Sequence, residues 1–534
     1  MAFLNATFNL YLLGFVALLF VLIKLTRPTK KKPNLPPSPP KLPIIGHIHQ
    51  LGTLPYRSFR DLSLKHGPLL WLQLGRIPAL LVSSADLARE LMKNQDAVFS
   101  GRFQSISART LLYGCKDIAY AAYGESWRQK RKICVLELLS LKRVRSFRVI
   151  REEEVAEMVK EIRRACLSDT NCSVNISDLI SATTNNIICR CIIGQKYDIS
   201  ESSGRFGTLA RKEMIHLAEL MVGDFFPWLG WVDVLTGKIQ ELKDTFKAMD
   251  GFFDEVTEDH EKVIKKDDEK KDFVDILLQL QRSDKLEFEP TQNDLKAILT
   301  DMFLGGNETT STTLEWILTE LWRNPRIMKK AQQEVRKVVG SKSKVDESDI
   351  NEMKYLKLVI KEALRLHPPA PFLIPRETVC DAKLGGYDIP SKTLIFVNIW
   401  AIQRDPEIWE NPEDFIPERF EKNQMDFKGQ DFEFIPFGSG KRTCPGVAFG
   451  LASVEFLLAN LLHWFDWNLP QDGSPECDID MSETYGLTVK KKVPIFFNLY
   501  RSRSNLNLLN LLSIMSCANT CDLFMKLSGI GLNK

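Results

Sequence analysis

One cysteine of this chain lies in a glycine-rich, cationic stretch near the end of the sequence. Residues 437–446 read Phe-Gly-Ser-Gly-Lys-Arg-Thr-Cys-Pro-Gly. Glycine allows a flat group to approach the backbone closely, and Pro445 fixes the bend. We expect backbone N–H groups and the two cations to lower the pKa of the Cys444 thiol, which favours an iron-binding thiolate. A buried, unreactive thiol beside a turn is the alternative interpretation.

A second reactive group lies inside residues 294–323, which have helical periodicity. Thr291 and Asp294 form a plausible capping box at its start, and Gly305 and Gly306 interrupt its middle. Each interior glycine costs about 1 kcal/mol relative to alanine, which suggests that a ligand approaches there or that the helical ladder opens to admit water. Glu308 and Thr309 follow, and an acid beside a hydroxyl can carry protons. A weakened helix with a solvated glutamate is the alternative.

An ion pair is predicted on a helix between these two features. Glu362 and Arg365 are three residues apart and therefore share one helix face. Such a pair contributes little on an exposed surface. Here it stands directly before the sequence His-Pro-Pro at 367–369, where the prolines end the helix. His367 is expected to be structural rather than a ligand.

These features, in this order, resemble the motifs of the cytochrome P450 family. The spacing Phe-x-x-Gly-x-Arg-x-Cys-x-Gly at 437–446 is similar to the haem-binding loop of that family, and the likeness extends from about residue 34 to residue 500. The residues of these motifs are similar to those of plant microsomal enzymes of the A-type group, which act in specialised metabolism. The resemblance implies a mainly α fold with a minor β-sheet: one large haem domain behind an N-terminal transmembrane helix.

The resemblance also assigns roles to individual residues. It implies that the Cys444 thiolate is the axial iron ligand, which pushes electron density toward O–O cleavage. It implies that Glu308 and Thr309 are the catalytic pair of the oxygen-activation motif. The other residues implied to hold haem b are Trp127, Arg131, Arg376, Phe437, Arg442 and Gly446. A structural cluster is implied for Glu362, Arg365 and Arg419.

The substrate-contact regions of the family match mostly apolar residues here. The expected substrate residues are Leu112, Ile118, Phe303, Gly306, Phe372, Leu373 and Leu487. An apolar, partly aromatic lining with few charges suits a lipophilic compound better than an amino acid or a sugar. We expect a terpenoid first, and an alkaloid or phenolic compound next.

The resemblance implies a monooxygenase that inserts one oxygen atom from O2. Its electrons would come from NADPH through a separate reductase, with cytochrome b5 as a further candidate partner, because no Gly-x-Gly-x-x-Gly follows a strand here. Lys130, Lys132 and Lys441 are expected to form a basic face for that acidic partner. Two alternatives stay open: a haem-thiolate isomerase or dehydratase that needs no reductase, and a non-catalytic haem binder.

Composition narrows the class of protein. The 534 residues include 71 basic and 68 acidic residues, for a net charge of +3, so nothing indicates a nucleic-acid partner. The 11 cysteines lack metal-type spacing, which indicates free thiols in a reducing compartment.

The N-terminus carries the membrane signal. Residues 8–25 are nearly all apolar, which is about the minimum length for a transmembrane helix, and basic residues follow at once. We predict a single-pass anchor in the endoplasmic reticulum membrane with the catalytic domain in the cytosol. The predicted organisation is an anchor with a basic flank at 1–32, a proline-rich hinge at 33–43, the haem-thiolate domain at 44–500 and an atypical extension at 501–534.

Local patterns predict mostly helices with a few strands. Long amphipathic helices are predicted at 126–164 and 238–265. Two strands are predicted within 69–83, and others at 382–389, 393–397 and 488–499.

Overall fold

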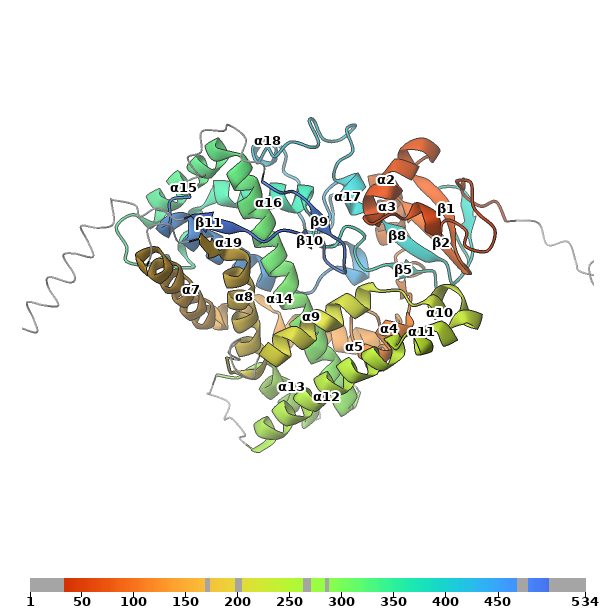
Figure 1. Cartoon of the computed structure of the whole chain (residues 1–534), viewed down its shortest axis with the longest axis horizontal. Coiled ribbons are helices and arrows are strands. Elements are labelled where there is room, and N and C mark those ends of the chain that lie inside the picture. Colours follow the sequence, from red (N-terminus) through yellow and green to blue (C-terminus); the bar gives the residue numbers. More distant parts are fainter. Residues whose placement is uncertain are drawn as a thin grey trace, which may run out of the picture.

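The computed structural model describes residues 33–168, 173–196, 204–262, 270–283, 288–467 and 479–498. The predicted anchor at 1–32 and the extension at 501–534 lie outside the described residues. Helices make up most of the domain, and a small sheet lies at one side (Figure 1).

The helices surround one long central helix, α14 (Gln292–Arg323), which packs against α8 and α19 (Figure 1). Thr291 begins α14 with the predicted capping box, and Asn324 ends it before a proline. The other α-helices are α2 (Pro55–His66), α3 (Ala85–Arg89), α4 (Ile106–Leu111), α5 (Glu125–Ile133), α6 (Leu141–Ser146), α7 (Arg148–Ser168), α8 (Ile176–Ile193), α9 (Gly204–Ala218), α10 (Val222–Phe225), α11 (Trp231–Leu235), α12 (Lys238–Lys262), α13 (Phe273–Gln281), α15 (Pro325–Val339), α16 (Lys354–Leu366), α17 (Ile399–Ile402), α18 (Arg419–Lys422) and α19 (Val447–Trp464).

The largest sheet has five strands in the order β1-β2-β8-β5-β3. Gly75, with a φ of 58°, makes the turn between β1 and β2. β3 and β5 pair antiparallel with Arg102 opposite Arg376, which brings together two arginines that are far apart in the sequence. The strands are β1 (Leu69–Leu74), β2 (Ile77–Val82), β3 (Gly101–Arg102), β4 (Ser173–Asn175), β5 (Arg376–Glu377), β6 (Ala382–Leu384), β7 (Tyr387–Ile389), β8 (Leu394–Val397), β9 (Glu483–Thr484), β10 (Lys490–Lys491) and β11 (Phe496–Asn498).

One predicted helix is divided in the structure. Residues 126–164 form α5, a π-helical turn (Cys134–Leu138), α6 and α7 rather than one helix. Ser140 accounts for one break, because its side chain accepts a hydrogen bond from the Arg143 N–H and begins α6. Amphipathic periodicity continues through such a break, so the pattern alone did not reveal it.

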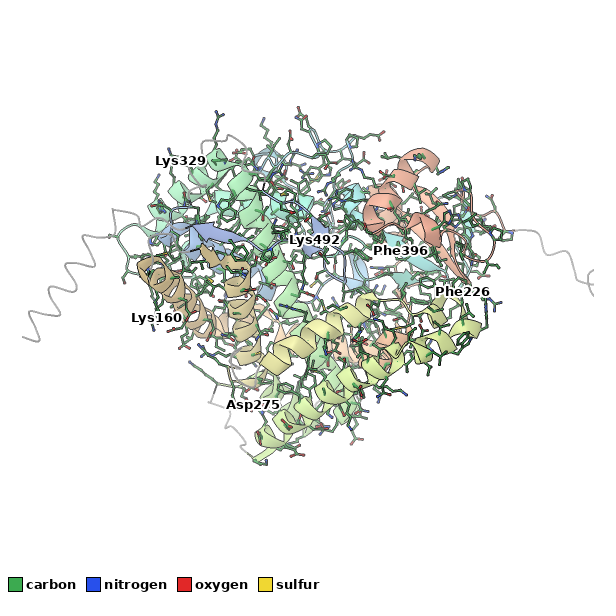
Figure 2. All side chains as sticks on the ribbon, in the orientation of Figure 1. Lys160, Phe226, Asp275, Lys329, Phe396 and Lys492 are labelled. Carbon is green, nitrogen blue, oxygen red and sulfur yellow. The ribbon has the colours of Figure 1, made fainter. Side chains whose placement is uncertain are left out.

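Burial follows the expected pattern. Charged side chains such as Lys160 on α7 and Lys329 on α15 point outward (Figure 2).

Within the described ranges, one helix is long and apolar enough to cross a membrane, α19, and 56% of that stretch is buried inside the domain. Because α19 directly follows the cysteine loop, its burial holds that loop against the core.

Candidate active site

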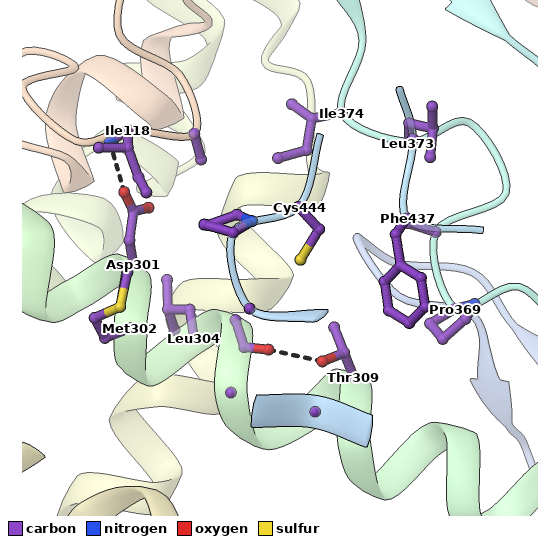
Figure 3. Close-up of a pocket in the computed structure, with 18 of the residues that line it drawn as sticks. Ile118, Asp301, Met302, Leu304, Thr309, Pro369, Leu373, Ile374, Phe437 and Cys444 are labelled. Carbon is purple, nitrogen blue, oxygen red and sulfur yellow. Dashed lines mark hydrogen bonds between the residues drawn. The ribbon is translucent and has the colours of Figure 1, made fainter. Parts of the chain in front are cut away.

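The functional residues gather around one cavity between α14 and the loop at 437–446 (Figure 3). Its volume is about 320 Å³. Cys444, Phe437 and Gly446 line it from the loop side, and Gly305 and Thr309 line it from α14. The structure therefore brings Cys444 and Thr309 to one cavity.

The cysteine loop is held in shape by its backbone. The Cys444 N–H donates to the Phe437 carbonyl oxygen at 2.9 Å. Gly440 has a φ of 71°, and a Cβ there would lie 2.3 Å from the Met92 carbonyl oxygen, so this position requires glycine. At Gly446 a Cβ would meet no protein atom nearer than 3.8 Å, so the protein itself leaves room beside the sulfur.

The predicted lowering of the Cys444 pKa is wrong for the protein alone. Burial raises the pKa of this thiol above its ordinary value, and a backbone hydrogen bond from Gly446 and the charge of Arg131 only partly oppose that effect. The thiolate therefore needs a further cation in the cavity, as a bound iron would supply.

A cluster of buried arginines lies beside the loop. Arg102, Arg376 and Arg442 are all at least nine-tenths buried. Burial, followed by the charges of the other two arginines, lowers the pKa of Arg102 well below its usual range. Burial, followed by Arg376, lowers the pKa of Arg442 to about 10. Among the described residues, Asp96 gives this cluster a direct carboxylate contact, at 2.8 Å from Arg376.

This surplus of buried positive charge fits a ligand that carries carboxylates. Arg102 donates to the carbonyl oxygens of Ala119 at 2.8 Å and of Ile374, and Arg442 donates to that of Ala121 at 2.6 Å. Neutral carbonyl groups do not cancel a guanidinium charge, whereas the propionates of haem would. Sequence reasoning missed Arg102, because its role arises from the pairing of β3 with β5.

Trp127 and Arg131 take their places through α5. The Trp127 indole N–H donates to the Ile118 carbonyl oxygen at 2.9 Å, and Trp127 is buried. Arg131 lines the cavity, donates to the Thr443 carbonyl oxygen and lies over the Trp127 ring. Arg131 is therefore placed to reach a group in the cavity, whereas the Trp127 donor is already used within the protein.

α14 presents its two glycines differently. A Cβ on Gly305 would meet no atom within 4 Å, whereas a Cβ on Gly306 would lie 2.6 Å from Ile188 Cδ1. Gly306 therefore lets α14 and α8 pack closely, although it also borders the cavity. The Thr309 hydroxyl donates to the Gly305 carbonyl oxygen at 2.7 Å (Figure 3). The helix is continuous here, so the predicted opening of its ladder is not seen.

Glu308 does not line the cavity. Its carboxylate pairs with Lys490 of β10, and 14% of its side chain is exposed. Consecutive helical residues are about 100° apart around the axis, so Glu308 points away while Thr309 faces the cavity. The acid and the hydroxyl are neighbours in the chain but are not hydrogen-bonded to each other in this conformation.

Glu362, Arg365 and Arg419 form one buried ionic cluster behind the cysteine loop. Arg365 donates two hydrogen bonds of 2.8 Å to the Glu362 carboxylate, and Arg419 donates a third of 3.0 Å. Glu362 and Arg365 are completely buried. The cluster does not reach the cavity, and it ties α16 to the segment that precedes the loop.

The expected substrate residues divide into two groups. Leu112, Ile118, Gly306, Leu373 and Leu487 line the cavity. Phe303 and Phe372 do not: Phe303 is buried in the helical core, and Phe372 packs 5.4 Å from Phe59 and 5.3 Å from Phe396 at the sheet. The turn after the prolines directs Leu373, not Phe372, toward the cavity.

Asp301 is a cavity residue that sequence reasoning missed. Its carboxylate accepts a hydrogen bond of 2.6 Å from the Ile118 N–H (Figure 3). Burial, followed by the charge of Asp117, raises the pKa of Asp301 well above its usual range. Asp301 thus attaches the loop that carries Ile118 to α14.

The prediction that Lys130 faces outward as part of a basic surface is wrong. Its side chain is 3% exposed and its ammonium lies 3.0 Å from the Asp294 carboxylate, so it joins α5 to the start of α14. Lys441 is 43% exposed, and its ammonium lies 3.9 Å from the Asp96 carboxylate.

Comparison with known proteins agrees with this geometry. The sequence pattern of the cytochrome P450 family matches residues 36–497. This chain belongs to the cytochrome P450 family. It is 52% identical to a phenylacetaldehyde oxime monooxygenase from Prunus mume over 92% of this chain and 95% of that protein. It is 46% identical to a desmethylyatein synthase from Sinopodophyllum hexandrum over 92% of this chain and 97% of that protein.

The fold of this P450 is shared with a solved animal P450. A solved structure of a zebrafish cytochrome P450 with progesterone superposes with a TM-score of 0.71 at 27% identity, covering 84% of this chain and 99% of that one. The chain is thus a plant A-type P450 monooxygenase with a mostly helical fold and a small sheet. Such enzymes use a haem-thiolate iron, O2 and electrons from a redox partner, and they act on lipophilic substrates.

Proposed function

We propose that this P450 oxygenates a terpenoid of plant specialised metabolism. The observation that supports the proposal is the aliphatic cavity wall opposite Cys444. Met302 and Leu304 of α14 line that wall, and Leu112, Ile118, Leu373, Ile374 and Leu487 line the sides. The two aromatic residues expected there, Phe303 and Phe372, lie elsewhere. An aliphatic wall holds a saturated carbon skeleton by shape. The aromatic residues that line the cavity, Tyr120, Phe273, Phe437 and Phe449, lie on segments other than α14.

In this proposal Cys444 ligates the iron, and the buried arginines and Gly446 accommodate the rest of the haem. The haem supplies the chemistry that cleaves O2. Thr309 holds its hydroxyl at the cavity wall by donating to the Gly305 carbonyl oxygen, which leaves the hydroxyl oxygen able to accept a hydrogen bond from a water molecule. Glu308 takes protons from solvent on the other face of α14 and delivers them toward Thr309 after its side chain rotates.

The same proposal places the enzyme on the endoplasmic reticulum membrane through residues 8–25 as an anchor, followed by the hinge at 33–43, the domain at 44–500 and the extension at 501–534. An exposed apolar patch supports it: Trp228, Trp231, Val234 and Leu235 are each at least half exposed. Arg76 of the β1–β2 turn lies over Trp228, so this patch adjoins the end of the domain where the chain leaves the hinge. An arginine beside exposed apolar residues at such an edge suits a membrane surface.

The proposed electron donor is an NADPH–cytochrome P450 reductase, with cytochrome b5 as an additional donor. Lys441 is partly exposed within the cysteine loop and supports docking of an acidic partner there.

The experiment is a substrate screen in yeast microsomes that contain the full chain and a plant reductase. Limonene, a larger cyclic sesquiterpene and phenylacetaldehyde oxime would be compared at equal concentration, with product formation under ¹⁸O2 followed by mass spectrometry. We expect NADPH-dependent incorporation of one labelled atom into a terpene. A C444S variant serves as the inactive control. Turnover of the oxime alone would replace the terpenoid proposal with an aromatic substrate, which the name of the Prunus relative favours.

A further inference from the structure

Lys490 makes a contact that none of the roles described so far explains. Its ammonium pairs with the Glu308 carboxylate, and the two side chains are 34% and 14% exposed. The pair therefore lies between the interior of the domain and solvent. Lys490 belongs to β10, a strand near the C-terminal end of the described chain that contacts α14 (Figure 1).

The backbone around Lys490 is fixed to both the cavity and α14. Leu487 and Thr488 line the cavity. The Val489 N–H donates to the Pro369 carbonyl oxygen at 2.8 Å, and the Val489 carbonyl oxygen accepts from the Trp316 indole at 3.1 Å. Because Trp316 belongs to α14, the strand that carries Lys490 is attached to the helix that carries Glu308. These two hydrogen bonds hold the backbone beside Lys490 next to α14, and therefore keep Lys490 near Glu308.

We propose that Lys490 is a positioning residue that sets the conformation and charge of Glu308, and so controls proton supply to the cavity. The inference rests on the proposed role of Glu308 and Thr309. In the observed arrangement Lys490 pairs with the carboxylate at the boundary between the interior and solvent, where 14% of the Glu308 side chain is exposed. A carboxyl group that has taken up a proton no longer attracts the ammonium and is free to rotate toward Thr309.

The charges around the pair fit this role. Burial, followed by the charge of Arg211 of α9, lowers the pKa of Lys490 to about 8, so its contact with the Glu308 carboxylate is what favours the ammonium form here. Lys491 of β10 and Glu315 of α14 lie nearby and interact with each other. Glu315 is engaged with the Ser177 hydroxyl, and Lys491 lies over the Trp316 ring at 5.2 Å. Neither offers Glu308 the contact that Lys490 makes, so neighbouring charges do not replace it.

The fate of O2 reports proton supply directly. Two electrons and two protons release O2 as H2O2, whereas four electrons and four protons convert it to two waters. In productive turnover one oxygen atom enters the substrate and the other leaves as water, using two electrons from NADPH and two protons. Proton delivery that is slow or misdirected therefore raises the fraction of NADPH electrons recovered as H2O2.

The test measures H2O2 and NADPH oxidation in microsomes with the full chain, reductase and limonene as an apolar probe. The variants are K490M, K490R, E308Q and the double variant E308Q/K490M. K491M is the matched control, since Lys491 is the adjacent lysine on the same strand. We expect K490M to raise the H2O2 fraction by about twofold or more. We expect K490R and K491M to match the wild type, and the double variant to match E308Q.

Each other outcome overturns a defined statement. A wild-type H2O2 fraction in K490M, with an altered fraction in E308Q, refutes the role of Lys490 and leaves that of Glu308 intact. An effect of K490M that persists in the E308Q background shows that Lys490 does not act through Glu308. A wild-type fraction in E308Q refutes the proposed relay and the inference together. The spectrum of the ferrous carbonyl complex, measured on every variant, separates these outcomes from loss of haem.

Discussion

The substitution E362Q tests the energetic role of the buried ionic cluster. It keeps the size of the side chain but removes the negative charge that Arg365 and Arg419 share. Arg365 is completely buried, so the variant leaves a guanidinium without its counter-charge. The carbonyl oxygens of Gln403 and Pro412, each 2.8 Å from Arg365, accept hydrogen bonds but do not neutralise it.

Removal of one partner from a buried ion pair costs about 3–5 kcal/mol of stability. An unfolding entropy of about 2 cal/mol/K per residue amounts to about 1 kcal/mol/K over the roughly 460 residues of the matched domain. The expected fall in Tm is therefore about 3–5 °C. Since native proteins are stable by only about 5–15 kcal/mol, we also expect a lower yield of haem-loaded protein.

The assay is thermal unfolding of the haem-loaded protein by circular dichroism, together with the yield of the ferrous carbonyl band per total protein. E157Q is the control. Glu157 forms an i,i+3 pair with Lys160, as Glu362 does with Arg365, but the side chains of Glu157 and Lys160 are both more than half exposed. Its Tm should equal that of the wild type. If E362Q also melts at the wild-type temperature, the cluster does not stabilise the domain and the reasoning from burial is wrong.

Three further predictions concern the cavity. T309A should keep the haem spectrum but release more H2O2 per NADPH, while T309S should behave as the wild type; equal coupling in T309A would remove the hydroxyl from the relay. L373A should alter the product ratios measured by product profiling, because one methylene in such a pocket changes selectivity by about 1–3 kcal/mol. F372L should lower the Tm and leave the product ratios unchanged, because Phe372 packs at the sheet and not in the cavity. G306A should lower stability by about 1–3 kcal/mol through the contact of its methyl group with Ile188, and an unchanged Tm would show that the two helices adjust freely.

The cysteine loop could be predicted from the sequence because its function depends on local chemistry. The glycines, the proline and Cys444 lie within ten consecutive residues, and each has a conformational or chemical reason to be there. The capping box of α14 and the strands β1 and β2 were predictable for the same reason. Short-range rules also located Gly305, but they did not distinguish its open environment from the close packing at Gly306.

Long-range pairing explains what the sequence did not reveal. Arg102 joins the arginine cluster only because β3 pairs with β5, and Lys130 is buried only because α5 packs at the start of α14. The side to which Phe372 points depends on the turn between α16 and β5. No periodicity extends across such a turn. The sequence therefore indicated the right segment, 371–374, but Leu373 lines the cavity and Phe372 does not.

The two sides of the cavity explain why the cofactor is better defined than the substrate. On one side, buried arginines repel one another, and Asp96 alone among the described carboxylates pairs with them directly. That arrangement favours an anionic ligand, so we expect haem binding to stabilise the folded domain, and the sign of the ligand charge follows from the arginines. On the other side, aliphatic groups exclude water without imposing a directional bond. Many lipophilic molecules satisfy such a wall equally well, so specificity there depends on shape and has to be measured with compounds.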